Sequence, residues 1–147
     1  MKHWIILFII AITGSLTAQK HVNLKKGFAA EGYDVVAYFS NEALKGDKEF
    51  TVEFEGVSYK FYSEENKQTF IVNPSKYVPQ YGGYCAYAVG LKNEKIGVNP
   101  KTYQIIDGKL YLFYNSFGVN TLEKWNEEGA SKLKQKADLN WSQIIQN

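Results

Sequence analysis

Cys85 is the only cysteine of the chain, and it lies in a tyrosine-rich stretch at residues 77–89. The preceding pair, Gly82-Gly83, can adopt positive φ and turn the chain sharply just before the thiol. A thiolate is a nucleophile and a ligand for soft metal ions, here copper or zinc. The stretch therefore predicts a binding site centred on Cys85, with the candidate residues Tyr81, Gly82, Gly83, Tyr84, Cys85 and Tyr87. A lone cysteine followed by Ala-Tyr-Ala-Val is also typical of a small buried apolar residue.

Redox chemistry is the alternative use of Cys85, as a thiolate that attacks a peroxide or a disulfide. The chain has no second cysteine to resolve the product and no arginine to activate the thiol. A lysine, a helix end or a partner would have to activate the thiol. No catalytic residue is assigned, and we favour a binding module over an enzyme.

Residues 1–18 have the pattern of a secretory signal peptide. Lys2 and His3 precede an apolar run at residues 4–12, and small and polar residues then lead to Ala18. The run is shorter than the roughly 20 residues that span a bilayer. We therefore expect an exported chain, periplasmic or extracellular, with no membrane span after cleavage.

Cleavage after Ala18 would create a second candidate metal site at His21. The new terminus would be Gln19-Lys20-His21. Its amine, two backbone amide nitrogens and the imidazole can surround Cu(II) or Ni(II) in a square plane. The alternative is a solvated histidine in a terminal tail.

Length and charge narrow the function classes. Removing 18 residues from 147 leaves 129, enough for one domain, and we expect an arm at 19–28 and a single domain at 29–147. The net charge of +2 becomes +1 when Lys2 is removed, which gives no reason to expect nucleic acid as a partner. Every basic residue is lysine, so bidentate guanidinium recognition of phosphate is absent.

The elements that position Cys85 are predicted from periodicity. Residues 35–39 form a short apolar run typical of a strand. Apolar side chains alternate at 50–54 and 57–61 around Gly56, which predicts a hairpin. Ser63 caps a predicted helix that ends before Asn73-Pro74. Residues 74–77 are expected to be a turn, and residues 91–100 a loop.

The C-terminal part predicts a second hairpin followed by helices. Asp107-Gly108 favours the primed turn of a hairpin, here between residues 103–106 and 109–114. Helices are expected at 120–128 and 130–136, separated by Gly129, with a last turn opened by Asp138. The predicted class is α+β: two hairpins and several short helices around one aromatic core.

Three blocks of this sequence resemble the YHS-domain proteins, in particular their exported bacterial branch. They are Gly-Tyr-Asp-Val-Val-Ala-Tyr-Phe at 32–39, Asn-Pro-Ser-Lys-Tyr-Val-Pro-Gln-Tyr-Gly-Gly-Tyr-Cys-Ala-Tyr-Ala-Val at 73–89, and Asp-Gly-Lys-Leu-Tyr-Leu-Phe-Tyr-Asn at 107–115. The resemblance extends over most of the mature chain and implies a YHS- or TRASH-like fold. Its core is expected at residues 32–89, and the C-terminal hairpin and helices at 101–147.

The resemblance also bears on metal binding. Related domains are thought to chelate metal through cysteines at positions that correspond to Tyr62 and Asn66, and a cysteine also occurs at the position of Ala37. None of these residues offers a thiolate, so this chain lacks the soft ligands of that site. Some relatives carry selenocysteine at the position of Cys85, which implies a redox or soft-metal role there.

Three hypotheses remain. In the first, the chain binds a metal ion or small ligand at Cys85. In the second, Cys85 is a redox thiol. In the third, Cys85 is buried and inert in an exported scaffold whose aromatic surface binds a protein or a glycan. A Ser-His-Asp triad is excluded from the folded core, because the one histidine of the mature chain lies in the predicted arm.

Overall fold

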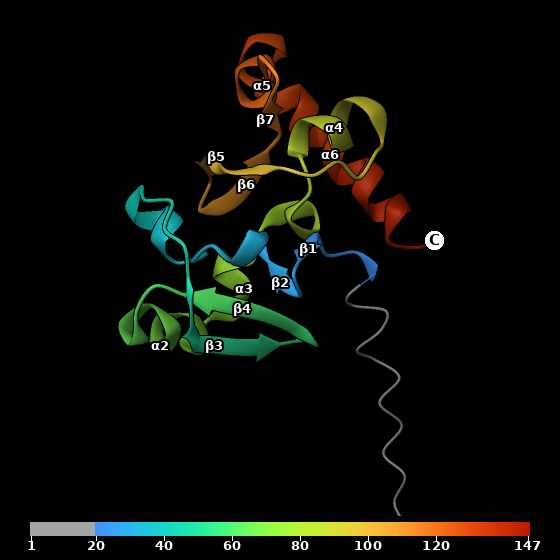
Figure 1. The fold of residues 1–147 in the computed structure, drawn as a ribbon. Coiled ribbons are helices and arrows are strands. Elements are labelled where there is room, and N and C mark those ends of the chain that lie inside the picture. Colours follow the sequence, from blue (N-terminus) through green and yellow to red (C-terminus); the bar gives the residue numbers. More distant parts are fainter. Residues whose placement is uncertain (1–19) are drawn as a thin grey trace, which may run out of the picture.

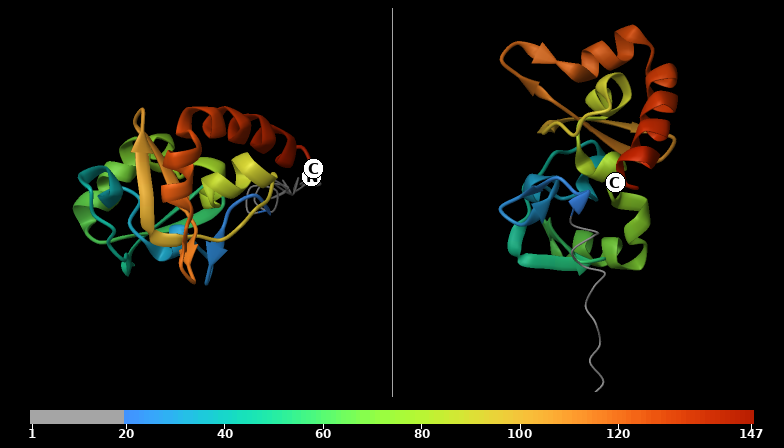
Figure 2. Two further views of the ribbon diagram at one scale, coloured as in Figure 1. Left: turned by 90° about the horizontal axis from the view of Figure 1, so that it is seen from above. Right: turned by 90° about the vertical axis from the view of Figure 1, so that its right-hand side faces the viewer.

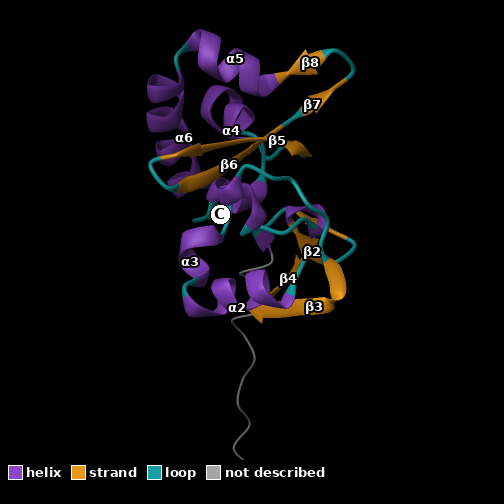
Figure 3. Cartoon of the chain, turned by 90° about the vertical axis from the view of Figure 1, so that its left-hand side faces the viewer, coloured by secondary structure: helices purple, strands orange, loops and turns teal. Residues whose placement is uncertain are grey.

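The chain folds into two lobes, one above the other in the computed structural model (Figure 1). The strands of residues 24–61 belong to the lower lobe, and the helices of residues 121–144 belong to the upper lobe. The structure describes residues 20–147, and the predicted signal peptide lies outside this range. The predicted α+β class is confirmed. The lower lobe holds the strands of residues 24–61 with the helices of residues 64–77, and the upper lobe holds the helices of residues 86–144 (Figure 3).

The lower lobe contains a four-stranded sheet. Its order is β1 (Leu24–Lys25), β2 (Phe28–Ala29), β4 (Val57–Phe61) and β3 (Asp47–Phe54). The antiparallel pair β3 and β4 is the first predicted hairpin, with Val52 opposite Tyr59. Strand β1 and the first residue of β2 fall within the segment expected to be a polar arm. That segment is instead part of the sheet, where Phe28 of β2 pairs with Ser58 of β4.

The prediction of a strand at residues 35–39 is wrong. This segment enters a 3-10 helix, η2 (Ala37–Ser40), which follows η1 (Ala30–Gly32). Oδ1 of Asp34 accepts hydrogen bonds from the backbone N–H groups of Val36 at 2.8 Å and Ala37 at 3.1 Å. An aspartate that caps the following turn in this way favours helical over extended backbone.

The middle of the chain is more helical than predicted. The helix α2 (Glu64–Val72) is confirmed, and Ser63 caps it by accepting from Asn66 N–H at 3.1 Å. The expected turn at 74–77 is the short helix α3 (Pro74–Tyr77). A 3-10 helix, η3 (Gln80–Gly83), then leads into α4 (Ala86–Lys92), which was not predicted.

Helix α4 has no polar stripe, because its residues 86–90 are all buried. Side chains that are buried on every side of a helix produce no 3.6-residue periodicity, which explains why this helix was missed. Its C-terminal end is held by Asn140, whose amide donates to the carbonyl of Val89 at 2.8 Å. A side chain at Gly90 would lie 2.7 Å from the carbonyl oxygen of Leu133, so glycine permits this close packing of α4 on α6.

The second predicted hairpin is confirmed as β5 (Asn99–Ile106) and β6 (Lys109–Phe113). Asp107 and Gly108 both have positive φ, at 50° and 72°, as a primed turn requires. A small hairpin of β7 (Asn115–Ser116) and β8 (Val119–Asn120) follows, which was not expected.

Two helices complete the upper lobe. Asn120 caps α5 (Thr121–Glu128), and Gly129, at φ 106°, separates it from α6 (Ala130–Ile144). We expected a break near Asp138, but α6 is continuous. The Asp138 carboxylate accepts hydrogen bonds from Tyr81 and Lys134 and so does not compete for backbone N–H groups.

The buried side chains form two clusters rather than the single core that was expected. The hairpin of β5 and β6 lies between the two lobes (Figure 2). Leu110 and Leu112 belong to the lower cluster, whereas Tyr111 and Phe113 belong to the upper one. Alternate side chains of a strand point to opposite faces, so β6 supplies apolar contacts to both lobes. Among residues 20–147, no helix is long and apolar enough to cross a membrane.

Candidate functional site

Cys85 is fully buried at the N-terminal end of α4. Its Sγ lies 3.3 Å from Oγ1 of Thr121, and the Thr121 hydroxyl donates to the carbonyl oxygen of Tyr114 at 2.7 Å. Because the hydroxyl hydrogen of Thr121 is already used, the Cys85 thiol is the donor between the two side chains. The thiol thus has a specific hydrogen-bond partner and no exposed surface.

A pocket of about 310 Å³ lies above this pair, and we call it the Cys85 pocket. Its walls are mainly apolar and come from α4, the loop after it, β8 and the start of α5. Lys92, Glu94 and Lys124 are its charged residues. Cys85 is one of the residues that line this pocket, but it is fully buried, so its thiol has no contact with solvent.

Tyr87 closes another side of the Cys85 pocket. Its hydroxyl donates to Oε1 of Glu128 at 2.8 Å. Burial, and next the hydrogen bond to Glu128, raise the pKa of Tyr87 to about 12. The phenol therefore remains a neutral donor at physiological pH.

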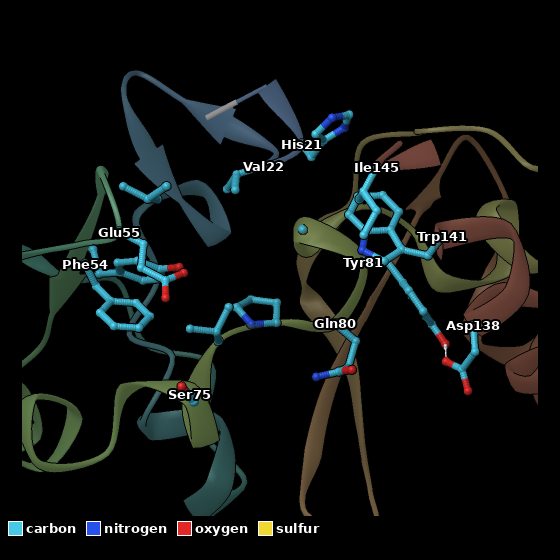
Figure 4. A pocket seen from close by; sticks show the side chains of 15 residues that line it. His21, Val22, Phe54, Glu55, Ser75, Gln80, Tyr81, Asp138, Trp141 and Ile145 are labelled. Atoms are coloured by element: carbon cyan, nitrogen blue, oxygen red, sulfur yellow. Dashed lines mark hydrogen bonds between the residues drawn. The ribbon is translucent and has the colours of Figure 1, made fainter. Parts of the chain in front are cut away.

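Tyr81 and Gly82 lie at a different place, in a pocket that is larger than the Cys85 pocket and that we call the interlobe pocket. It has a volume of about 500 Å³ and lies between β3–β4, η3 and α6 (Figure 4). Tyr81, at φ 55°, donates from its hydroxyl to Oδ1 of Asp138 at 2.7 Å. Burial, and next this hydrogen bond, raise the pKa of Tyr81.

The Gly82-Gly83 pair joins the N-terminal segment to this region. Both glycines have positive φ, as predicted for a sharp turn. Asn23 donates its backbone N–H to the carbonyl of Gly82 at 2.8 Å and its side-chain amide to the carbonyl of Gly83 at 3.2 Å. A side chain at Gly82 would overlap the carbonyl oxygen of His21.

The six candidate residues are therefore divided between two pockets. Cys85 and Tyr87 line the Cys85 pocket, and Tyr81 and Gly82 line the interlobe pocket. Gly83 and Tyr84 line neither of the two. The Tyr84 ring lies 6.3 Å from that of Trp141, with Nζ of Lys95 at 5.7 Å from its centre.

His21 packs against the protein. Its ring lies edge-on to Trp141 at 6.3 Å, and its Nδ1 is buried with no hydrogen-bond partner among residues 20–147. Burial, then Lys95 and Lys20, lower the pKa of His21. Gln19, whose amine the predicted square-planar metal site requires, lies outside the described residues.

A buried carboxylate, that of Asp34, lies between Ala37, Tyr62 and Asn66. Asp34 is fully buried. Its Oδ2 accepts from Tyr62 N–H at 2.9 Å and from the Asn66 amide at 2.8 Å, while Oδ1 accepts from Ala37 N–H. N–H groups of Ala37, Tyr62 and Asn66 thus meet around one carboxylate. Asp34 was not among the predicted site residues, although an aspartate before a short apolar run is typical of a cap.

A third pocket, of about 380 Å³, lies beside η1 and is lined by four lysines, Lys25, Lys26, Lys45 and Lys60. Lys25 pairs with Glu31 at 2.8 Å, and Nζ of Lys60 lies 4.1 Å from the centre of the Phe28 ring. Two of its four ammonium groups are therefore already held by an intramolecular partner.

Comparisons with protein-family models, with curated proteins and with solved structures found no match to this chain.

Proposed function

We propose that this chain is an exported binding module of the YHS type and that it binds a small, largely apolar ligand in the Cys85 pocket. One observation carries this proposal. Leu91, Ile96 and Val119 are 45%, 37% and 40% exposed, and all three line this pocket. Large apolar side chains that gather at the mouth of a pocket on a protein surface mark a place where apolar material binds.

The charges suggest the rest of the ligand. Lys92 and Lys124 line the pocket with one acidic residue, Glu94. Two ammonium groups against one carboxylate favour a ligand whose polar end is acidic. The volume of about 310 Å³ is at the lower end for ligand pockets, which suits a small molecule. We therefore propose a ligand with a compact apolar body and one acidic group.

The YHS type is supported by the meeting of Ala37, Tyr62 and Asn66 around Asp34. The donors present do not fit the metal centre that the resemblance implies. Cys85 is one soft ligand beside one hydroxyl, and residues 20–147 contain no group of three or more His, Cys, Asp or Glu side chains that could hold a metal ion. A closed zinc site needs four ligands.

Anilinonaphthalene sulfonate tests the proposal, because it combines an apolar body with one acidic group and fluoresces when bound. We expect saturable binding, weakened about tenfold or more in Leu91→Glu and in Val119→Glu through the lost apolar contact and the repulsion of the sulfonate. Leu139→Glu is the matched control, because Leu139 is 67% exposed on α6 and does not line the pocket. Equal affinity in all three variants would contradict the proposal.

The reactivity of Cys85 separates this function from thiol redox chemistry. Full burial and the contact with Thr121 predict that a thiol reagent reacts about a hundredfold or more slowly in the folded protein than after denaturation. Its rate should rise with urea as the protein opens. Rapid alkylation of the folded protein, or peroxide consumption lost in Cys85→Ser, would favour the redox alternative.

A further inference from the structure

The interlobe pocket has an unusual charge for this chain. The protein has 17 basic residues, all lysine, yet none of the residues that line this pocket is a lysine. Its charged groups are the carboxylates of Glu55 and Asp138. Its one histidine, His21, has a lowered pKa and is neutral near pH 7. The residues that line the pocket therefore carry net negative charge within a protein of net positive charge, with Asp138 paired to Lys134 at 3.3 Å and Glu55 unpaired among residues 20–147.

Aromatic rings make up much of the remaining surface. Phe54 and Tyr59 come from the lower lobe, and Trp141 comes from α6 of the upper lobe. Figure 4 shows Phe54 and Glu55 on one side of the pocket and Trp141 on the opposite side. The faces of these rings carry partial negative charge and attract cations, Trp most strongly.

Glu55 is available to a ligand. It lies in the exposed turn between β3 and β4 and makes no ion pair within the part of the chain that the structure describes. The charge of Glu55 reaches into the pocket, since it acts on Tyr59. Burial is the first cause that raises the pKa of Tyr59 to about 12, and the charge of Glu55 is the second. Asp138, in contrast, already accepts hydrogen bonds from Tyr81 and Lys134.

We propose that the interlobe pocket is a second binding site and that it takes a small organic cation of the quaternary or alkylated ammonium class, between Trp141 and Phe54 with Glu55 as counter-ion. The volume of about 500 Å³ accommodates such a group together with a short polar tail. Gln80 and Ser75, which also line the pocket, offer hydrogen bonds to that tail. This site is separate from the Cys85 pocket and does not depend on the function proposed for it.

Choline and its neutral carbon isostere, dimethylbutanol, test the charge requirement directly, since they differ chiefly in the positive nitrogen. We expect calorimetric titration of the full mature protein to show choline binding about fivefold or more tightly than the alcohol. The fluorescence of Trp141 should change on binding, because Trp125, the other tryptophan of residues 20–147, is fully buried and does not line the pocket.

Glu55→Gln removes the counter-ion while keeping the side-chain length, and we expect it to remove most of the preference for choline. Glu53→Gln is the matched control, because Glu53 is exposed on β3, two residues away, and does not line the pocket. Both variants lie at exposed positions and leave the core unchanged. Equal binding of choline and alcohol, no saturable binding of choline, or an equal loss in both variants would overturn the proposal. Binding of anilinonaphthalene sulfonate at the Cys85 pocket should be unaffected by Glu55→Gln.

Discussion

The side-chain amide of Asn66 donates a hydrogen bond of 2.8 Å to Oδ2 of Asp34, joining the first turn of α2 to the turn before η2. The backbone N–H groups of Tyr62, Val36 and Ala37 donate to the same carboxylate. Asp34 is fully buried, and these donors satisfy both of its carboxylate oxygens. It therefore holds together three segments of the lower lobe.

Asp34→Ala should be among the most destabilising substitutions in the lower lobe. It leaves four donors without an acceptor, and we expect the free energy of unfolding to fall by about 3 to 5 kcal/mol. Urea denaturation followed by circular dichroism measures the loss. Asn66→Ala removes only one of the four donors and should cost about 1 kcal/mol. An Asp34→Ala protein as stable as Asn66→Ala would show that the carboxylate is not the centre of this network.

Alkaline pH should unfold the protein cooperatively. Burial is the first cause of a raised pKa in five buried tyrosines. The pKa is about 12 for Tyr59, Tyr87 and Tyr111, and it is also raised for Tyr38 and Tyr81. The folded protein holds these protons more tightly than the unfolded chain, whose tyrosines titrate near pH 10. Unfolding then releases protons, so stability is complete below about pH 10 and falls as the pH rises towards 12.

Tyrosinate absorbance and circular dichroism, recorded on the same samples, measure this effect. The buried tyrosines should ionise together with the loss of structure, whereas protein in guanidinium should titrate smoothly near pH 10. Full ionisation of all tyrosines at pH 10 with the fold intact would contradict the prediction.

Gly82→Ala should weaken the attachment of the N-terminal segment. A methyl group there would overlap the carbonyl oxygen of His21, and φ of 60° disfavours alanine. We expect a loss of about 2 kcal/mol or more and faster hydrogen exchange at Asn23 N–H, which bonds the Gly82 carbonyl. Gly97→Ala is the control, since nothing lies within 4 Å of a side chain there. Equal stability of the two variants would contradict the role given to Gly82.

Local patterns were sufficient for much of the fold. The alternation around Gly56, the Asp107-Gly108 turn, the Ser63 cap and the break at Gly129 each predicted an element that the structure contains. These features depend on residues within a few positions of one another, so the sequence displays them directly. The lone Cys85 and the glycine turn before it were likewise evident from sequence.

Other features depend on contacts between residues far apart in the chain. Residues 86–90 of α4 are all buried, so the helical period is hidden, and Asp34 contacts Asn66 only after the chain has folded back. The tertiary structure also separated Tyr81 from Cys85, because the turn at Gly82-Gly83 directs the two side chains to different pockets. The sequence by itself determined the α+β class and the unusual stretch around Cys85. Only the packing of the two lobes on β5 and β6 decided that Cys85 is buried and that the larger pocket lies between the lobes, because burial and cavities arise from long-range contacts.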